Sequence, residues 1–494
     1  MEILYLLAAT LILIMLFRRF IGLGNKYIYP PGPMGLPFVG NALQFGNIAP
    51  HLKHEEFSEK YGDIHTVTMF GQKSVVLNSM DVVKHCNFDH SDDFNHRPIW
   101  LESLCNIAPG IAFRGVDRYK ENRRFVLRNL RDHGMGKSEL EPNILNEIDS
   151  VLSIIEQSTE RTVEPQDLME TFSSNVISQM CFSKSWPHNG EESEMFKNNL
   201  HAIMVGTDAI TLCDLLPFLK RLPSMKKVSS EFMRNVNYIQ SIARNAIKDR
   251  QNLSQSYDDE CIAYESMDLV DDFLLASKNQ PSEVDMKNFM QISHDLFEAG
   301  THTTATTLTF SIIQLIHKPK LQEKLYEQIQ KCLGDRINPE MADMKHMPMV
   351  EAFIQEILRM YPIVPLIFHA TYRDSNLREF VIPKNTMILI NAYRINYEEK
   401  TFPYPKEFQP TRWIDDDGNF KALEKDSIIT FGTGRRSCLG KSLARMEIFL
   451  FLVKLIRKYK IGIPEGNKLP SCEPVAGRAT LTMEKFLLKV TMRE

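Results

Sequence analysis

The chain of 494 residues lacks the paired cysteines that mark zinc sites and disulfide scaffolds. Its eight cysteines are scattered, and none belongs to a C-x-x-C pair. Zinc sites need clustered ligands, so no zinc site is predicted. Scattered cysteines in a large chain are typical of a reducing compartment. We expect buried, inert thiols for seven of them: Cys86, Cys105, Cys181, Cys213, Cys261, Cys332 and Cys472.

The chain also lacks an excess of charge of one sign. It has 58 lysines and arginines against 62 aspartates and glutamates, which gives a net charge of −4. Nucleic-acid binding domains usually carry a strong basic excess, so we expect no nucleic-acid partner. No internal repeat or low-complexity tract is present. The hydrophobic share of 43% is typical of a globular protein.

One long apolar run stands at the N-terminus. Residues 3–17 are uncharged and almost wholly apolar, and Arg18, Arg19 and Lys26 follow them. A cleaved signal peptide would place positive charge before such a run, whereas Glu2 stands there. With residues up to 23 included, the run approaches the ~20 residues of a membrane span. The charges predict a retained transmembrane anchor over 1–23, with the rest of the chain on the cytosolic side.

A basic and proline-rich segment, 24–41, follows the predicted anchor. It contains "YPPGPMGLPFVGN", in which four prolines restrict φ and the glycines permit turns. We interpret it as a stiff hinge, and an ordinary proline-rich linker is the alternative. No hydrophilic linker divides the remainder, so 42–494 is predicted to be one catalytic domain.

The pattern of apolar residues predicts a mainly α fold with a small β portion. Alternating residues at 64–70 and 74–78 predict a hairpin around Gly71, and 387–391 predicts a further strand. Helical periodicity covers six longer segments, at 144–156, 227–250, 283–317, 321–333, 348–360 and 440–457.

The longest predicted helix, 283–317, has an unusual middle. Ser282 and Asp285 predict its start, and Pro319 its end. Five threonines crowd the stretch "EAGTHTTATT", 298–307, where their hydroxyls can bond carbonyls one turn earlier. Gly300 is expected to let a flat group approach the backbone. An ordinary core helix is the alternative.

One cysteine has distinctive surroundings. Cys438 lies in "FGTGRRSCLG", 431–440, directly before a predicted helix. The helix N-terminus, Gly434, Gly440 and the two arginines would favour a thiolate of low pKa. With no second ligand close in sequence, the pattern suits a single axial ligand to a haem iron. A structural cysteine at a helix start remains the alternative.

These residues resemble a known family. "FGTGRRSCLG" matches the F-x-x-G-x-R-x-C-x-G signature of the cytochromes P-450, the haem-thiolate monooxygenases. Further segments stand in the family's order: "EILR" at 356–359, "FQPTRW" at 408–413, "AGTHTT" at 299–304 and the proline-rich hinge. "RDHGMGKSELE", 131–141, and "FVIPKNT", 380–386, are similar to the microsomal branch that oxidises drugs, steroids and fatty acids.

The resemblance implies a cytochrome P-450 fold with haem b and a role for individual residues. Cys438 would be the axial iron ligand. Glu356, Arg359 and Arg412 would form a buried ion-pair network, although periodicity alone places Glu356 and Arg359 on the surface as an i,i+3 pair. The residues that would contact the cofactor are Tyr119, Arg123, Ala299, Gly300, His369, Phe431 and Arg436.

Two positions depart from the family pattern. Tyr119 stands where a tryptophan normally donates a hydrogen bond to a haem propionate, and a phenol can also donate one. His302 stands where an acid normally precedes the catalytic threonine, here Thr303. Thr303 would orient the waters that deliver protons for oxygen activation. His302 is predicted to relay protons, because histidine titrates near neutral pH; a packed or solvated histidine is the alternative.

The resemblance also implies the partners and the location. An NADPH-cytochrome P-450 reductase would supply electrons at a basic face formed by Arg124, Arg128, Arg131, Lys441 and Arg445. The anchor would hold the enzyme in the lipid of the endoplasmic reticulum membrane. A lipophilic substrate, with identity and regiochemistry open, would meet a pocket lined by Phe297, Ile363, Val364, Leu366 and Ile367.

Two other functions use the same cofactor. A haem-thiolate isomerase or dehydratase would rearrange a peroxide substrate without a reductase, and the missing acid at position 302 is the feature that favours it. A non-catalytic haem carrier or sensor is the second alternative. Thr303 and the basic face favour the monooxygenase over the isomerase, and Cys438, Thr303 and the Glu356–Arg359 pair favour it over the carrier or sensor.

Overall fold

The computed structural model describes Thr10 and residues 27–101, 103, 110–113, 116–255, 266–421, 427–476 and 480–493. The chain divides into two compact units, and each is described by itself. The first comprises Met1–Pro98 with Ile367–Asn391, and the second Ile99–Leu366 with Ala392–Glu494. Within the described ranges no helix is long and apolar enough to cross a membrane. The predicted anchor, 1–23, lies outside them except for Thr10.

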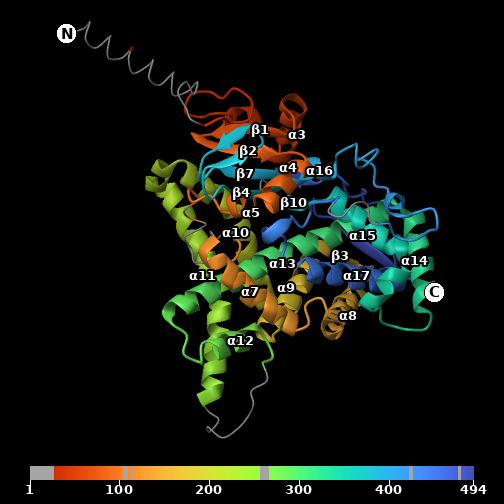
Figure 1. Cartoon of the computed structure of the whole chain (residues 1–494). Helices are drawn as coiled ribbons and strands as arrows, with labels where there is room; N and C mark the ends of the chain where they lie inside the picture. The colour runs from red at the N-terminus through yellow and green to blue at the C-terminus, as the bar shows by residue number, and fades with distance from the viewer. Residues whose placement is uncertain are drawn as a thin grey trace. The chain divides into compact units, whose positions relative to one another are not determined.

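The first unit is built on a four-stranded sheet with the order β1-β2-β7-β4 (Figure 1). The predicted hairpin is confirmed, because β1 (Ile64–Met69) pairs antiparallel with β2 (Gln72–Leu77) around Gly71, whose φ is +84°. The predicted strand β7 (Met387–Asn391) pairs parallel with β2. The other elements of this unit are α2 (Ala42–Phe45), α3 (Pro50–Tyr61), α4 (Met80–Lys84), η1 (His85–Asp89), α5 (Ser91–Phe94), β4 (Leu366–Ala370), β5 (Ser375–Leu377) and β6 (Phe380–Ile382).

The described part of the proline-rich segment runs along β1. The carbonyl of Pro31 accepts the N–H of Thr66 at 2.9 Å, and the N–H of Asn41 donates to the carbonyl of Thr68. A Cβ on Gly32 would lie 1.9 Å from the Thr66 carbonyl oxygen. Glycine is therefore required here because two backbones approach closely.

The second unit is mainly helical, and its helices include all six predicted ones. The helices are α7 (Val116–Asp132), α8 (Glu141–Gln157), α9 (Pro165–Phe182), α10 (Glu191–Leu215), α11 (Pro223–Gln255), α12 (Leu269–Ala276), α13 (Glu283–His317), α14 (Pro319–Leu333), α15 (Pro348–Met360), α16 (Ala392–Asn396) and α17 (Lys441–Lys458). Short helical turns lie at η2 (Ser138–Leu140), η3 (Thr159–Arg161), η4 (Pro217–Arg221), η5 (Met341–His346), η6 (Pro410–Trp413) and η7 (Gly434–Arg436).

Two small sheets complete this unit. One has the order β3-β11-β8 and the other pairs β9 with β10. Their strands are β3 (Thr162–Val163), β8 (Tyr459–Gly462), β9 (Val475–Ala476), β10 (Leu481–Thr482) and β11 (Leu488–Met492). The mainly α fold with a small β portion is thus confirmed.

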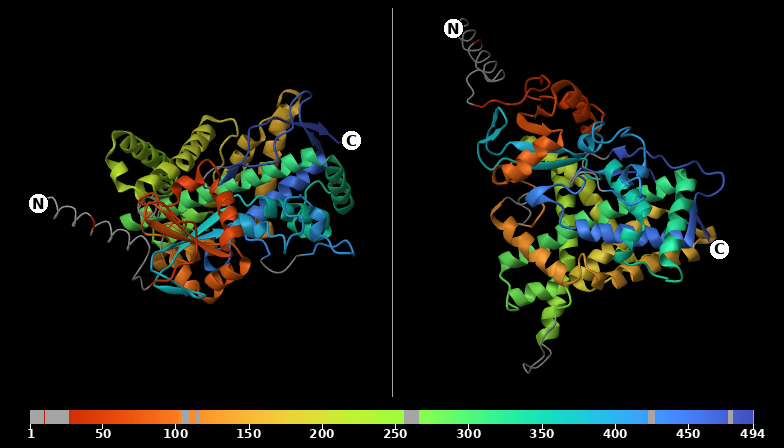
Figure 2. Two further views of the ribbon diagram at one scale, coloured as in Figure 1. Left: turned by 90° about the horizontal axis from the view of Figure 1, so that it is seen from above. Right: turned by 45° about the vertical axis from the view of Figure 1, so that its right-hand side comes forward.

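Helix α13 is the central element of the second unit, and it packs against α9, α11 and α17 (Figures 1 and 2). The Ser282 hydroxyl accepts the N–H of Asp285 and caps its N-terminus. The predicted back-bonding of threonines is confirmed: the hydroxyl of Thr303 donates to the Ala299 carbonyl at 2.7 Å, and that of Thr307 to the Thr303 carbonyl at 2.8 Å.

Gly300 lies where a neighbouring helix packs closely against α13. A Cβ at this position would lie 2.8 Å from Cδ1 of Ile177 on α9. Helix α9 thus approaches α13 closely at Gly300, and the expected approach of a flat group at this glycine stays a prediction.

Candidate active site

The Cys438 loop connects η7 to α17. Positive φ angles at Gly432 (+65°) and Gly434 (+68°) shape the loop, and glycine adopts such angles without strain. The Cys438 N–H donates to the Phe431 carbonyl at 2.7 Å. Cys438 is an exposed residue, whereas the other five described cysteines are buried or partly buried; Cys105 and Cys261 lie outside the described residues. The sequence therefore folds to place one exposed cysteine just before a helix.

The electrostatics around Cys438 differ from the expectation. Although part of Cys438 reaches the surface, the protein atoms packed around its thiol desolvate it and raise its pKa, and this effect outweighs the lowering by the N–H groups of Gly440 and Lys441 and by the charge of Arg123. The predicted low pKa is thus wrong for the protein alone, because desolvation disfavours the thiolate more than these groups favour it. A coordinated metal deprotonates a thiol outright, so a bound iron would itself stabilise the negative charge on the Cys438 sulfur.

Three of the predicted cofactor residues gather at this loop. Arg123 on α7 donates to the Ser437 carbonyl at 2.8 Å. The Tyr119 hydroxyl donates to the Arg435 carbonyl at 2.7 Å, and the Arg436 guanidinium lies 3.3 Å from the centre of the Tyr119 ring. The structure thereby brings together side chains that are more than 300 positions apart in sequence. His369 is buried in β4 of the first unit.

The middle of α13 is mostly buried but has one accessible face. Leu296, Ala299, Gly300 and Thr303 are half-buried or exposed, whereas the residues at 301, 302 and 304–316 are buried. The i, i+3, i+4, i+7 spacing places these four on one side of the helix. Three of them have small side chains.

These features suit a haem. A flat cofactor bound through a thiolate needs an accessible sulfur with N–H donors and a nearby surface without bulky side chains. Cys438 supplies the first, and the accessible face of α13 supplies the second. Helix α13 packs against α17, which begins three residues after Cys438.

His302 is directed toward α9. Its Nδ1 lies 3.2 Å from Glu170 Oε1, and its Nε2 lies 3.4 Å from the Thr306 hydroxyl. Burial alone would raise the pKa of Glu170, but hydrogen bonds from His302 and Gln166 lower it. The carboxylate partner on α9, which the sequence analysis missed, has no signal in the local sequence because it lies 132 positions away.

The predicted ion-pair network is present and buried. Arg359 makes two hydrogen bonds of 2.9 Å to the Glu356 carboxylate, and Arg412 donates to the same carboxylate at 3.0 Å. Both Glu356 and Arg359 have 0% exposed side chains, so the surface pair expected from periodicity is wrong. The Trp413 indole also donates to Glu356, at 2.8 Å, a partner that the sequence analysis missed.

The residues predicted to line a substrate pocket separate into two groups. Val364, Leu366 and Ile367 are partly exposed, whereas Phe297 and Ile363 are buried. The Phe297 ring packs in an aromatic cluster with Phe196, at 5.0 Å between ring centres, and with Phe182 and Trp186. The structure assigns Phe297 to this core, which corrects the expectation that it faces a substrate.

One residue of the predicted basic face, Arg445, is not free at the surface. Arg124, Arg128, Arg131 and Lys441 are exposed. Arg445 instead pairs with Glu351 at 3.3 Å and is three-quarters buried. Its charge is used within the fold, so we exclude it from a docking surface.

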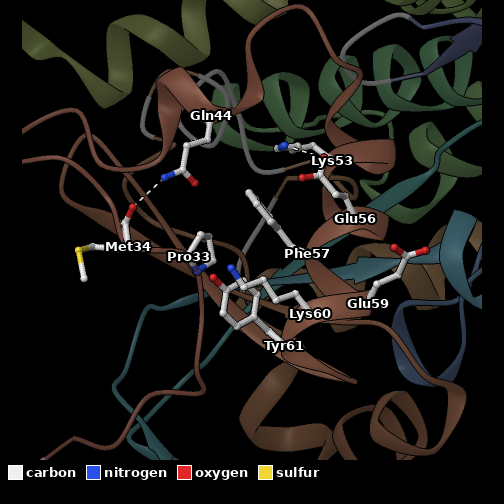
Figure 3. Close-up of a pocket in the computed structure, with 9 residues that line it drawn as sticks. All are labelled: Pro33, Met34, Gln44, Lys53, Glu56, Phe57, Glu59, Lys60 and Tyr61. Atoms are coloured by element: carbon white, nitrogen blue, oxygen red, sulfur yellow. Dashed lines mark hydrogen bonds and ion pairs between the residues drawn. The ribbon is translucent and has the colours of Figure 1, made fainter.

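A surface groove of a different character lies in the first unit (Figure 3). It is lined by Pro33, Met34, Gln44, Lys53, Glu56, Phe57, Glu59, Lys60 and Tyr61, none of which is a predicted site residue. The described residues contain no group of three or more His, Cys, Asp or Glu side chains arranged to hold a metal ion.

The helical fold and the cysteine loop define a haem-thiolate protein. Comparison with known sequences gives the family. The sequence model "Cytochrome P450" matches residues 30–490. Similar curated proteins include cytochrome P450 2C26 of Mesocricetus auratus, 32% identical with 87% of this chain and 88% of the relative covered, and cytochrome P450 2C41 of Canis lupus familiaris, 34% identical over the same shares. Cytochrome P450 2C39 of Mus musculus is 31% identical, with 93% and 92% covered.

The chain belongs to the cytochrome P450 family. It is a monooxygenase, an oxidoreductase whose cofactor is haem b with a cysteine thiolate ligand. Among the described cysteines, Cys438 is the exposed one, and the N–H groups of Gly440 and Lys441 donate to its sulfur, as such a ligand requires.

Proposed function

We propose that this monooxygenase inserts one atom of O2 into a lipophilic small molecule, such as a steroid, a fatty acid or a xenobiotic. Electrons would come from NADPH through NADPH-cytochrome P-450 reductase. The observation that carries this proposal is the combination of the exposed Cys438 with the small-residue face of α13. The partly exposed apolar side chains of Val364, Leu366 and Ile367 support a lipophilic substrate.

Individual residues would have separate roles in haem binding and oxygen activation. In the second unit, Tyr119, Arg123 and Arg436 would hold the haem propionates, with Phe431, Ala299 and Gly300 beside the ring. The role of His369, in the first unit, is carried only by the family resemblance. Cys438 would hold the haem, which when bound would supply the oxygen-activating chemistry, and a thiolate ligand favours O–O cleavage. The Thr303 hydroxyl now donates to the Ala299 carbonyl, so its oxygen is free to accept a hydrogen bond from a water on the exposed face.

His302 is proposed to relay protons, with Glu170 as its carboxylate partner. Its contacts with Glu170 and Thr306 mean that protons would pass along α9 and α13 rather than directly from the exposed face. His302→Ala is expected to lower the fraction of NADPH consumption that yields product. Unchanged coupling would exclude the relay and leave a packing role.

The reductase would dock on the exposed cations of the second unit. Reversing two charges, Arg124→Glu with Arg128→Glu, is expected to slow reduction and to weaken its dependence on ionic strength. Arg445→Gln is unsuitable for this test, because it breaks the pair with Glu351.

The location follows from the N-terminal sequence. The apolar run and the positive charges after it support a single-pass anchor over 1–23 in the endoplasmic reticulum membrane, with the catalytic part on the cytosolic side. Carbonate extraction of cell membranes measures this. The full chain should remain with the membrane, and loss of the anchor by deletion of 1–23 should increase the soluble fraction.

Reconstitution tests the reaction itself. Purified protein, reductase and lipid are incubated with candidate steroids and fatty acids under 18O2, and the products are analysed for the label. Label incorporation that requires both NADPH and reductase supports the proposal. Rearrangement of an organic peroxide in their absence would instead support the isomerase, the alternative favoured by the missing acid at position 302.

A further inference from the structure

The surface groove of the first unit combines apolar surface with balanced charge (Figure 3). Its volume is about 660 Å³, and its apolar lining comes from Pro33, Met34, Phe57 and Tyr61. Helix α3 adds two lysines and two glutamates to the lining, Lys53, Lys60, Glu56 and Glu59. The groove therefore has no net charge, and it suits a ligand that carries one charge of each sign.

The four charged side chains are not equally paired. Lys53 Nζ lies 2.6 Å from Glu56 Oε2, and the Lys53 side chain is only 12% exposed. Lys60 and Glu59 are exposed, and neither forms an ion pair with another described residue. Lys60 Nζ lies 5.4 Å from the centre of the Tyr61 ring. One cation, one carboxylate and one aromatic ring of the groove thus remain available to a ligand.

Large apolar side chains that continue from the groove are exposed. Met34, which lines the groove, is 84% exposed, and Phe38 and Leu43 are 85% and 70% exposed. All three lie within ten residues of one another in sequence. Exposed apolar patches of this kind mark a contact with another protein or with a membrane.

Chain length limits how far the groove can lie from the membrane. The predicted anchor ends at residue 23, ten residues before Pro33. A fully extended chain of ten residues spans at most about 33–36 Å. The groove and the exposed apolar side chains beside it are therefore within this distance of the end of the anchor, so lipid headgroups are close at hand.

We propose that the groove binds the phosphocholine headgroup of a membrane phospholipid. Lys60 would contact the phosphate, and Glu59 with the Tyr61 ring would contact the quaternary ammonium, which aromatic rings recognise through cation–π interactions. Met34 and Phe38 would contact the acyl chains. This inference rests on the proposed membrane anchor and is independent of the proposed reaction.

Competition between lipids tests this proposal. The full-length holoprotein is placed in nanodiscs that contain equal parts of phosphatidylcholine, phosphatidylethanolamine and phosphatidylglycerol. Native mass spectrometry of the released protein then counts the lipids of each class that it retains. The wild type is expected to retain phosphatidylcholine about two- to fivefold over either competitor, the range that one exposed ion pair supplies.

Two substitutions separate the two halves of the headgroup. Lys60→Glu should lower retention of phosphatidylcholine to the level of the competitors, because it removes the partner of the phosphate. Tyr61→Leu should remove the preference over phosphatidylethanolamine, which has no quaternary ammonium. Lys384→Glu is the matched control, because Lys384 is an exposed cation of the same unit 5.7 Å from the Tyr372 ring, and it should change neither preference.

Equal retention of the three lipids by the wild type would overturn the proposal, as would unchanged preferences in both variants. Failure of the proposed anchor is distinguishable, because the chain would then not associate with nanodiscs at all. That result would overturn the anchor and the headgroup site together, whereas equal retention overturns the site alone.

Discussion

At the scale of single residues, buried charge in this protein is tolerated where it is fully paired. Glu356 receives hydrogen bonds from Arg359, Arg412, Trp413 and the backbone N–H of Gln409. Burial alone would raise the pKa of Glu356, but the hydrogen bonds and charge of Arg359 lower it. These hydrogen bonds replace the ones that water would donate to an exposed carboxylate. Through them, Glu356 connects α15 to the segment that contains η6.

Removing this carboxylate should destabilise the fold strongly. Glu356→Ala leaves Arg359 buried without a counter-charge, which costs about 3–5 kcal/mol. Urea unfolding followed by circular dichroism measures the loss. The matched control is Glu192→Ala, which removes an exposed acid 3.8 Å from Lys184 and should shift the midpoint little. Equal effects of the two substitutions would contradict the assigned role of Glu356.

Glu447 is the opposite case, because it is buried and forms no ion pair with a described residue. Burial raises its pKa well above 4.5, and the nearby Ser173 hydroxyl offsets this only in part. A folded state that prefers the protonated form loses stability as pH rises above the pKa of the unfolded chain, ~4.5. Glu447→Gln removes this loss, so the variant should gain stability over the wild type as pH rises from 5 to 8. A difference that is constant over this range would contradict the prediction, and Glu465→Gln serves as an exposed control.

At the scale of elements, helix α3 is joined to strand β1 by two neutral histidines. His54 Nδ1 lies 3.1 Å from His65 Nε2, and His65 Nδ1 lies 2.9 Å from the Asn78 amide. Burial lowers the pKa of His54 to about 3 and that of His65 to about 4. The packing of α3 on the sheet therefore requires both rings to stay uncharged.

This contact predicts acid sensitivity of the first unit. A histidine with a depressed pKa in the folded state contributes stability above the unfolded pKa of about 6.5, and this contribution is lost as pH falls toward 4. The urea midpoint of the wild type should therefore fall between pH 7 and pH 5. His54→Gln should fall less steeply, whereas the exposed His90→Gln should keep the wild-type slope. Identical slopes for all three proteins would contradict the account.

At the scale of the whole molecule, the sequence predicted local elements well and contacts between distant residues poorly. The helices, the hairpin and the Cys438 loop follow from periodicity, turns and a short motif. The burial of Glu356 and Arg359 did not follow from the apolar stripe of α15, because their partner Arg412 lies more than 50 positions away. The raised pKa of the Cys438 thiol and the close contact of Gly300 with Ile177 likewise arise from tertiary packing, which a local sequence pattern does not predict.

The central claim is that Cys438 holds the haem iron as a thiolate. The most direct measurement is the absorption spectrum of the dithionite-reduced protein with and without carbon monoxide. The wild type and Cys472→Ser should both give a strongly red-shifted Soret band, which Cys438→Ser should lose. A wild-type band at the position of histidine-ligated or thiol-ligated haem in correctly folded protein would contradict the account.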